Sequence, residues 1–200
     1  MGVMKLYFSN GSCSLSTHIA LEESGAVFEA QRLNLREGDQ KKPEFLAVNP
    51  KARVPALVID GGRVLTEVPA VLSYIADTHP EAKLLAPPGE WARAKAQEWM
   101  AWCASTVHPH MGPLFRDRDN AEQKKLVQAD LDHYDAWLKG TYVLGETFSA
   151  ADCYTLVFTL WALNFGLNLG PKMRASAKAL LQRPAVQRAV QTHQLKYDKL

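Results

Sequence analysis

The stretch MKLYFSNGSCSLSTHIALEES (residues 4–24) decides the fold. Residues 4–9 form a short apolar run rich in aromatic side chains, which is typical of a buried strand. From residue 15 onward, apolar side chains recur at helical spacing, and this pattern ends at Gly25, a residue type that commonly terminates helices. Residues 27–35 alternate like a strand, so the chain is expected to begin as a β-α-β unit.

A hairpin and a helix are expected after this unit. Residues 38–50 predict a loop with a short helix, and residues 54–67 hold two β-branched runs around an Asp-Gly-Gly turn. Residues 68–80 predict a helix with Pro69 in its first turn, where proline is tolerated. The order βαβ-αββα is typical of a thioredoxin-like domain, which we expect over residues 1–82.

The remainder of the chain predicts helices only. Residues 83–90 contain a Pro-Pro-Gly sequence and are expected to be a linker. An all-helical C-terminal domain is expected over residues 91–200. Its predicted helices cover residues 91–116, 121–139, 150–167, 172–182 and 184–197. Ser149 and Asp152 have the spacing of a capping box at the start of the third of these helices. The predicted fold class is therefore an α/β domain followed by an all-α domain.

The charge and cysteine content of the chain argue against several classes of partner. A formal net charge of +2 over 200 residues is too small to predict a nucleic-acid or acidic-membrane partner. No stretch approaches the roughly 20 apolar residues of a membrane span, and the first residues lack the apolar run of a signal peptide. Three widely spaced cysteines argue against a disulfide framework and suit a reducing compartment. We therefore expect a cytoplasmic protein.

Cys13 lies where a predicted strand gives way to a predicted helix. Backbone N–H groups and the positive end of the helix dipole can stabilise a thiolate at such a position. Ser16 stands where a C-x-x-C motif would have its second cysteine, so Cys13 could form a mixed disulfide but not an internal one. Free cysteines are also common as small buried hydrophobic residues. From this residue alone both interpretations stay open.

Two further positions could bind a peptide-like ligand. In a thioredoxin-like domain the bond between Val54 and Pro55 is usually cis, and the Val54 backbone can then pair with a ligand as an added strand. A plain proline at a strand start is the alternative. Glu67 precedes a predicted helix, where its carboxylate suits an ammonium group and the free N–H groups suit a carboxylate. Glu67 could equally serve only to complement the helix dipole.

His108 and His110 are candidates for proton transfer or metal binding. Residues two apart do not share a helix face, and no cysteine or acidic ligand lies close to them in the sequence. We therefore expect no metal site.

The chain resembles bacterial cytosolic glutathione transferases, in particular the beta class. Four stretches carry the resemblance, in the family's order: KLYFSNGSCSLSTHIALEESG, GDQKKPEFLAVNPKARVPALV, LTEVPAVLSYIAD and FSAADCYTLVF. The resemblance implies a thioredoxin-like N-terminal domain, a helical C-terminal domain, a homodimer and reduced glutathione as cosubstrate. It also implies a role in detoxification.

The resemblance assigns roles to residues of the thioredoxin-like domain. Cys13 matches the active-site cysteine of the beta class, and Val54 matches the residue that pairs with the cysteinyl backbone of glutathione. Arg53 is counted with the glutathione-binding residues, and Glu67 matches the acid that holds the γ-glutamyl amine. Val68 departs from the family, which usually has a serine there. The Val68 N–H can still donate, but one lost hydrogen bond to a charged group costs about 1.5–3 kcal/mol.

The resemblance also assigns roles in the helical domain. His108 matches a histidine near the thiol and is expected to be catalytic. His108, Met111 and Phe115 are expected to line the pocket for a hydrophobic substrate. Two departures from the family occur here. Pro109 stands where a basic residue often follows the histidine, and Ala101 stands where some members have an asparagine.

The expected activity is that of a glutathione S-transferase, which conjugates glutathione to small hydrophobic electrophiles. One alternative is glutathione-dependent reduction of disulfides or peroxides with Cys13 as the nucleophile. The other is a non-catalytic member that binds a ligand or serves as a scaffold, which Val68 would favour.

Overall fold

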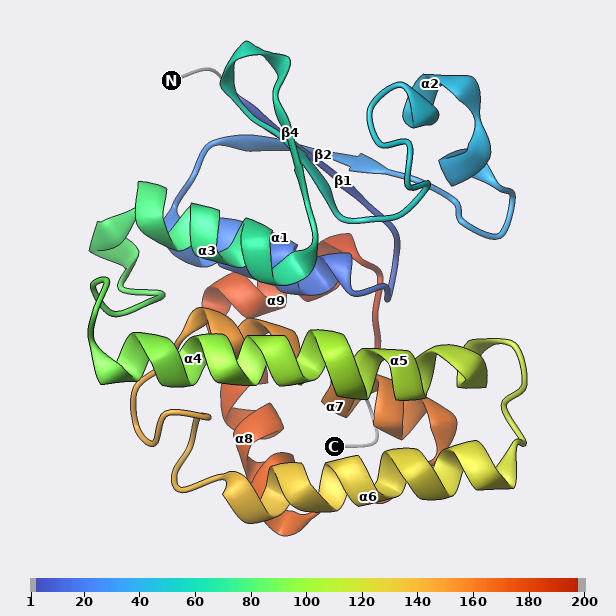
Figure 1. Ribbon diagram of the computed structural model, residues 1–200, viewed down its shortest axis with the longest axis vertical. Coiled ribbons are helices and arrows are strands. Elements are labelled where there is room, and N and C mark those ends of the chain that lie inside the picture. The colour runs from blue at the N-terminus through green and yellow to red at the C-terminus, as the bar shows by residue number, and fades with distance from the viewer. Residues whose placement is uncertain (1–2, 198–200) are drawn as a thin grey trace. The chain divides into compact units, whose positions relative to one another are not determined.

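The computed structural model describes residues 3–197, and they divide into two compact units. The first unit contains the chain up to Leu84 together with Pro184–Lys196, and the second contains Leu85–Arg183. Figure 1 shows a mixed sheet with helices in the first unit and helices alone in the body of the second. Residues 184–196 pack with the first unit, although their position in the sequence follows the whole of the second.

A four-stranded mixed sheet organises the first unit. Its strands are β1 (Met4–Phe8), β2 (Phe28–Arg32), β3 (Ala56–Val58) and β4 (Val64–Thr66), in the order β2-β1-β3-β4. β1 pairs in parallel with β2, whereas β3 runs antiparallel to both β1 and β4. The predicted order of elements and the thioredoxin-like architecture are confirmed. The strands are shorter than predicted, since β2 ends at Arg32 and a 3₁₀ turn occupies the Asp-Gly-Gly segment of the hairpin.

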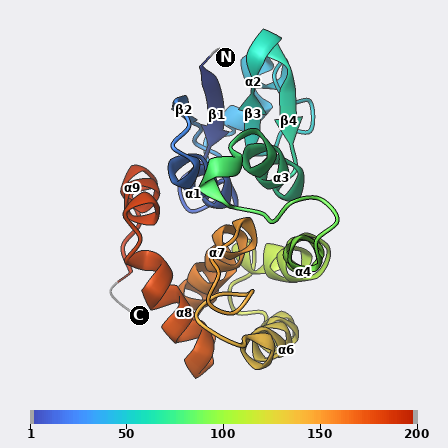
Figure 2. The same cartoon turned by 90° about the vertical axis from the view of Figure 1, so that its left-hand side faces the viewer.

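Helices cover both faces of this sheet. Helices α1 (Ser14–Ser24) and α3 (Val68–Thr78) pack side by side, and α9 (Pro184–Thr192) packs along α1, as Figure 2 shows. Apolar residues of α1 and α3, among them Ile19 and Leu72, are fully buried. The short helix α2 (Pro43–Leu46) contributes Phe45 to a separate apolar cluster that contains Val54. This cluster fixes the loop that leads into β3.

The second unit contains α4 (Trp91–Trp102), α5 (His108–Met111), α6 (Ala121–Trp137), α7 (Ala150–Phe165) and α8 (Pro171–Leu181). The helix predicted over residues 91–116 is interrupted by a π-helical turn at Cys103–Val107 and ends in a 3₁₀ turn at Gly112–Phe115. Pro109 explains the interruption, because proline cannot donate to the carbonyl four residues earlier and its ring collides with that carbonyl.

The predicted capping box at the start of α7 is confirmed. Asp152 Oδ2 accepts hydrogen bonds from the Ser149 N–H at 2.8 Å and the Ser149 hydroxyl at 2.9 Å. Its Oδ1 accepts a third from the Val143 N–H at 2.8 Å. One fully buried carboxylate therefore joins the helix start to the preceding loop.

Helix α9 is shorter than predicted, because it ends at Thr192 rather than at residue 197. Within residues 3–197, no helix combines the length and the apolar character needed to cross a bilayer.

Candidate functional site

A tight turn carries the chain from β1 into the helix that begins after Cys13. The Ser12 N–H donates to the Ser9 carbonyl at 3.1 Å, and Gly11 adopts the left-handed conformation with a φ of 66°. The Ser12 hydroxyl also donates to the Ser9 carbonyl at 2.9 Å and lies 2.6 Å from the Ser14 hydroxyl. These bonds hold Cys13 at the N-cap position of α1.

The Cys13 side chain is a buried thiol that donates to a backbone carbonyl. Its Sγ lies 3.4 Å from the carbonyl oxygen of Val54. Burial raises the pKa of the Cys13 thiol to about 12, and Glu67 adds to this rise, whereas a backbone hydrogen bond and Arg53 oppose it. Of the two interpretations that the sequence leaves open for Cys13, burial therefore favours the neutral thiol over a thiolate at the helix N-terminus, because the cost of desolvating the charge exceeds the gain from the helix.

Val54 presents its carbonyl to Cys13 from a buried position. The Val54–Pro55 peptide bond is cis, as predicted. The Val54 side chain is buried with Leu33, Phe45 and Ala56. Cys13 and Val54, 41 residues apart in the sequence, are thus in direct contact.

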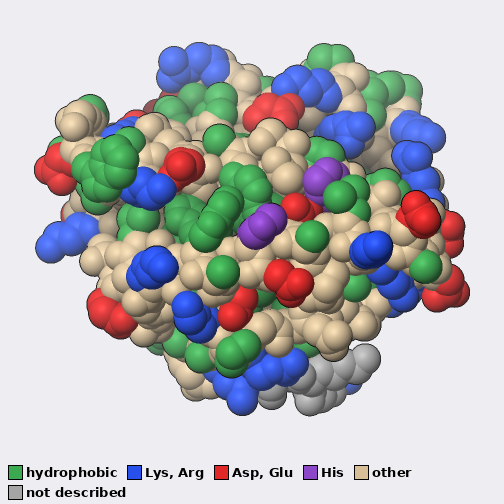
Figure 3. All heavy atoms as spheres, turned by 60° about the horizontal axis from the view of Figure 1, so that its bottom comes forward, with side chains coloured by type: hydrophobic (Ala, Val, Ile, Leu, Met, Phe, Trp, Pro, Cys, Tyr) green, Lys and Arg blue, Asp and Glu red, His purple; other side chains and the backbone are tan. Residues whose placement is uncertain are grey.

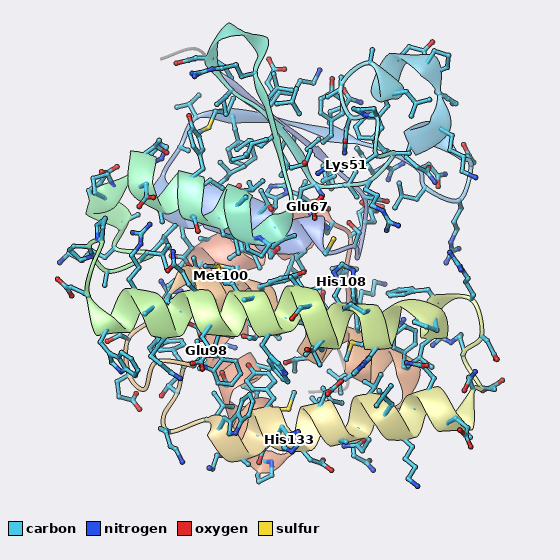
Figure 4. All side chains as sticks on the ribbon, viewed as in Figure 1. Lys51, Glu67, Glu98, Met100, His108 and His133 are labelled. Carbon is cyan, nitrogen blue, oxygen red and sulfur yellow. The ribbon has the colours of Figure 1, made fainter. Side chains whose placement is uncertain are left out.

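Glu67 has an unusual backbone conformation at the start of α3. Its φ of 70° and ψ of 119° lie outside the regions that non-glycine residues normally occupy. Strained residues of this kind cluster at functional sites. The side chain is 67% exposed, and Glu67 Oε1 accepts a hydrogen bond from Lys51 Nζ at 2.7 Å, a pair labelled in Figure 4. Lys51 also donates to Thr66 Oγ1 at 2.8 Å.

Val68 and Arg53 complete the predicted glutathione-binding set. Val68 is the first residue of α3, and its side chain is buried in the core. The first backbone N–H groups of a helix have no partner within that helix, so they suit an anion. The Arg53 side chain is exposed, while its carbonyl accepts a hydrogen bond from Asn49 Nδ2 at 2.7 Å. All the predicted residues of this set come from the first unit.

Lys51 was missed by the sequence analysis. It lies 16 residues before Glu67, and no local motif links a lysine in the loop before β3 with an acid just after β4. Only the pairing of β3 with β4 brings them together.

In the second unit, His108 lies among aromatic side chains. Its Nδ1 is 3.1 Å from the Tyr154 hydroxyl, and its ring packs edge to face against Phe158 and Trp161 with centroid distances of 5.7 and 5.1 Å. Tyr154 is a contact that the sequence did not predict, because it lies 46 residues away on α7. The contact fixes the orientation of the imidazole.

The other two predicted pocket residues have different environments. Met111 is completely buried, which argues against its predicted role in lining a substrate pocket, because its side chain is packed within the helical core. Phe115 is half exposed and packs against Trp161 and Phe165 at centroid distances of 4.8 and 4.9 Å. Across the described residues, no group of three His, Cys, Asp or Glu side chains could hold a metal ion.

Comparison with known proteins identifies the family. Residues 11–78 match the glutathione S-transferase N-terminal domain, and residues 98–186 match the C-terminal domain. The chain is 37% identical to glutathione S-transferase GstA of Escherichia coli O157:H7, with 96% of this chain and all of GstA covered. The chain belongs to the glutathione S-transferase family.

Solved structures place the chain among bacterial members of the family. The beta-class glutathione S-transferase of Sphingomonas chungbukensis is 35% identical, with a TM-score of 0.87 over 96% of this chain and all of that one. A sphingomonad glutathione S-transferase complexed with glutathione is 37% identical, with the same TM-score and the same coverage. The resemblance to bacterial glutathione transferases of the beta class is confirmed.

Proposed function

We propose that this transferase binds reduced glutathione and conjugates its sulfur to small hydrophobic electrophiles. The observation that supports this most strongly is the contact between the Cys13 thiol and the Val54 carbonyl, close to the strained Glu67 at the start of α3. The Val54 carbonyl suits the cysteinyl peptide group of glutathione, and the Glu67 carboxylate suits the ammonium of its γ-glutamyl group. The free N–H groups at the start of α3 suit the γ-glutamyl carboxylate. Homologous structures that hold glutathione support the same assignment.

The raised pKa of Cys13 gives this residue the role of a hydrogen-bond donor. When the cysteinyl N–H of glutathione pairs with the Val54 carbonyl, it competes with Cys13 for that acceptor. The Cys13 S–H is then available to donate to the glutathione sulfur and stabilise the thiolate.

Conjugation then follows from a positioned thiolate. The glutathione thiol loses its proton, and its sulfur attacks the electrophilic carbon to form a C–S bond. A leaving group departs with its electron pair, or the electrons of an activated double bond take up a proton. We assign proton handling to His108, held by Tyr154, and contact with the apolar substrate to His108 and Phe115.

Glutathione-dependent reduction through Cys13 is the second candidate. The absence of a resolving cysteine at position 16 suits a mixed disulfide, and Ser16 Oγ instead donates to the Cys13 carbonyl at 2.6 Å. A thiol with a pKa of about 12 is a poor nucleophile at neutral pH, which favours conjugation. The third candidate, a ligand carrier or scaffold, rests on the missing hydroxyl at Val68.

Calorimetric titration with reduced glutathione tests the binding site. We expect micromolar to low-millimolar binding by the wild type and by Cys13→Ala. Glu67→Gln should bind at least 10-fold more weakly, because a charge-assisted bond is lost (about 1.5–3 kcal/mol). Glu98→Gln, which alters an exposed carboxylate paired with Lys95 on α4, is the matched control and should bind normally. Absence of binding by the wild type would refute both glutathione-dependent activities and leave the carrier.

A second assay separates the two enzymatic candidates. Conjugation of glutathione to a chlorodinitrobenzene should persist in Cys13→Ala, reduced about 10-fold by loss of one donor. Reduction of a mixed disulfide should be absent or feeble in the wild type. Strong reduction that disappears in Cys13→Ala, without conjugation, would favour the reductase.

We also propose that the protein is a cytoplasmic homodimer without a nucleic-acid or membrane partner. The thiols of Cys13, Cys103 and Cys153, which form no disulfide with one another, suit a reducing compartment. The second unit has an aromatic cluster in which Trp99, Trp102 and the half-exposed Trp137 pack edge to face or tilted. Exposed aromatic surface of this kind is common in interfaces. Figure 3 shows a face on which hydrophobic side chains gather between charged ones.

A further inference from the structure

Two histidines that the proposed chemistry does not use are buried in contact in the first unit. His18 on α1 is 2% exposed, and His193, just after α9, is 0% exposed. Their ring centroids are 5.2 Å apart, and Phe8 of β1 packs against both. Among the described residues, neither ring nitrogen of His193 and not the Nδ1 of His18 has a hydrogen-bond partner. Such buried polar atoms are uncommon and require an explanation.

The surroundings of the pair favour uncharged imidazoles. The β-strands present the phenyl rings of Phe8 and Phe28 to it. A charged group, Glu22 of α1, lies 3.8 Å from His18 Nε2, and Arg188 of α9 already binds this carboxylate at 2.6 Å. Protonation of either histidine would therefore place a positive charge among aromatic rings at the α1–α9 contact.

Burial sets the pH range in which the two histidines become protonated. Burial lowers the pKa of His18 to about 4, although Glu22 opposes the fall. Burial lowers the pKa of His193 to about 3, and His18 adds to the fall. Both pKa values lie below the ordinary histidine pKa of 6.5. The neutral pair therefore makes its full contribution to the stability of the fold above pH 6.5. That contribution is lost progressively as the pH falls from 6.5 toward 4 and below.

The chain just after His193 has an unusual backbone. The Leu195 N–H donates to the Val190 carbonyl at 3.2 Å, and Gln194 has a φ of 54°. This is the geometry of a Schellman motif, in which the left-handed position is usually glycine. Gln194 offers a side chain that glycine would lack. Its Oε1 accepts hydrogen bonds from Asn10 Nδ2 at 3.2 Å and from Arg32 at 3.5 Å.

The same segment contacts the turn that leads into Cys13. Asn10, the partner of Gln194, is the second residue of this turn. A β-carbon placed on Gly11 would lie 3.4 Å from Leu195 Cδ2. The Leu195 side chain therefore packs next to Gly11, the third residue of the turn. Two successive residues after His193 therefore hold two successive residues before Cys13.

We propose that His193–Leu195 is a clamp that positions the Asn10–Gly11 turn, and with it Cys13, and that protonation of the His18–His193 pair releases this clamp. The clamp would keep the Cys13 thiol in reach of Val54 above pH 6.5 and loosen it in acid. Its effect on turnover rests on the proposed glutathione chemistry, but its effect on the turn does not.

Hydrogen exchange of the turn tests the clamp without glutathione. Exchange of the peptide that contains residues 9–13 is followed by mass spectrometry at pH 7.5 and pH 4.5, corrected for the intrinsic rates. Reaction of Cys13 with dithiodipyridine, a disulfide that thiols attack even in acid because its pyridine nitrogen is protonated, is followed in parallel. In the wild type we expect both readouts to rise at least 5-fold at pH 4.5 while the far-UV circular dichroism is unchanged.

Two variants separate the parts of the proposal. Gln194→Gly removes the side-chain bonds and suits the left-handed backbone, so it should raise both readouts at pH 7.5 without lowering Tm. Gln191→Ala, a change at an exposed residue of α9, is the matched control and should change neither readout. The double variant His18→Phe with His193→Phe keeps aromatic rings in place and should abolish the rise in acid.

The outcomes are decisive for the clamp alone. Unchanged exchange in Gln194→Gly, or a rise in acid that persists in the double variant, would overturn it. If the double variant does not fold, Gln194→Gly still decides whether the segment positions the turn. Neither readout involves glutathione. The test of the clamp therefore stands even if the calorimetric titration shows that the protein does not bind glutathione.

Discussion

At the scale of single residues, Cys13 illustrates a competition between burial and a helix N-terminus. The helix end stabilises a thiolate by a fraction of the several kcal/mol that desolvating a buried charge can cost. Burial prevails, and the pKa of the thiol rises to about 12. Sequence position alone could not predict this, because the degree of burial depends on Val54 and on the rest of the fold.

This pKa predicts slow alkylation of Cys13. Below its pKa the thiolate fraction falls tenfold per pH unit, so the reaction with iodoacetamide should be orders of magnitude slower than that of free cysteine at pH 8. The rate should continue to rise above pH 10. Peptide mapping by mass spectrometry measures it, and a plateau between pH 8 and pH 9 would contradict a buried neutral thiol.

Ala52 carries backbone strain in the loop before Val54. Its φ is 53°, a conformation that costs a residue with a β-carbon about 1 kcal/mol relative to glycine. We therefore expect Ala52→Gly to raise the free energy of unfolding by about 0.5–1 kcal/mol in urea denaturation. Ala94→Gly, at an exposed position within α4, should instead lower it by about 1 kcal/mol. Equal effects of the two changes would rule out strain at Ala52.

In the proposed glutathione complex, Lys51 would compete with the ligand for Glu67. The ammonium of glutathione would have to displace Lys51 Nζ from the carboxylate, and this exposed ion pair is worth at most about 1 kcal/mol. Lys51→Ala should therefore tighten glutathione binding up to about 5-fold at low salt, and the gain should shrink as salt rises. Calorimetry at two salt concentrations checks this. Weaker binding at both would show that Lys51 contacts the ligand directly.

At the scale of elements, the start of α7 depends on one carboxylate. Asp152 satisfies three donors in a place without access to water. Asp152→Ala would leave these donors unpaired, so we expect a loss of about 2–4 kcal/mol in the free energy of unfolding. Urea denaturation with Asp132→Ala, an exposed acid on α6, provides the comparison. A loss below about 0.5 kcal/mol in Asp152→Ala would mean that water replaces the carboxylate.

The elements also show how far sequence reasoning reaches. The order of the strands and helices and the capping box follow from patterns within a few residues, and the sequence predicts them correctly, although it makes the strands too long. Val54 and Glu67 could be singled out from the sequence because they stand at recognisable junctions, one before a strand and the other before a helix. Tyr154 against His108 could not be predicted, because it depends on the packing of two distant helices. The π-helical turn before His108 was missed, although Pro109 was a signal for it.

At the scale of the whole molecule, the proposed homodimer can be tested by mass in solution. Light scattering should give twice the 22.2 kDa of the chain. Trp137→Glu would bring a charge into the aromatic cluster and should shift the protein to the monomer, with unchanged circular dichroism. Val27→Glu, at an exposed position of the first unit, should leave the dimer intact. A wild-type monomer would disprove the assembly.

The position of residues 184–196 near the end of the sequence determines when the first unit can be completed during translation. Because these residues complete a unit whose sheet is translated first, the sheet, α1 and α3 emerge from the ribosome long before α9 and the clamp. The whole second unit is made in between. The surface of α1 that α9 covers, including His18, therefore stays open during elongation, and the native first unit can close only after translation has passed residue 196.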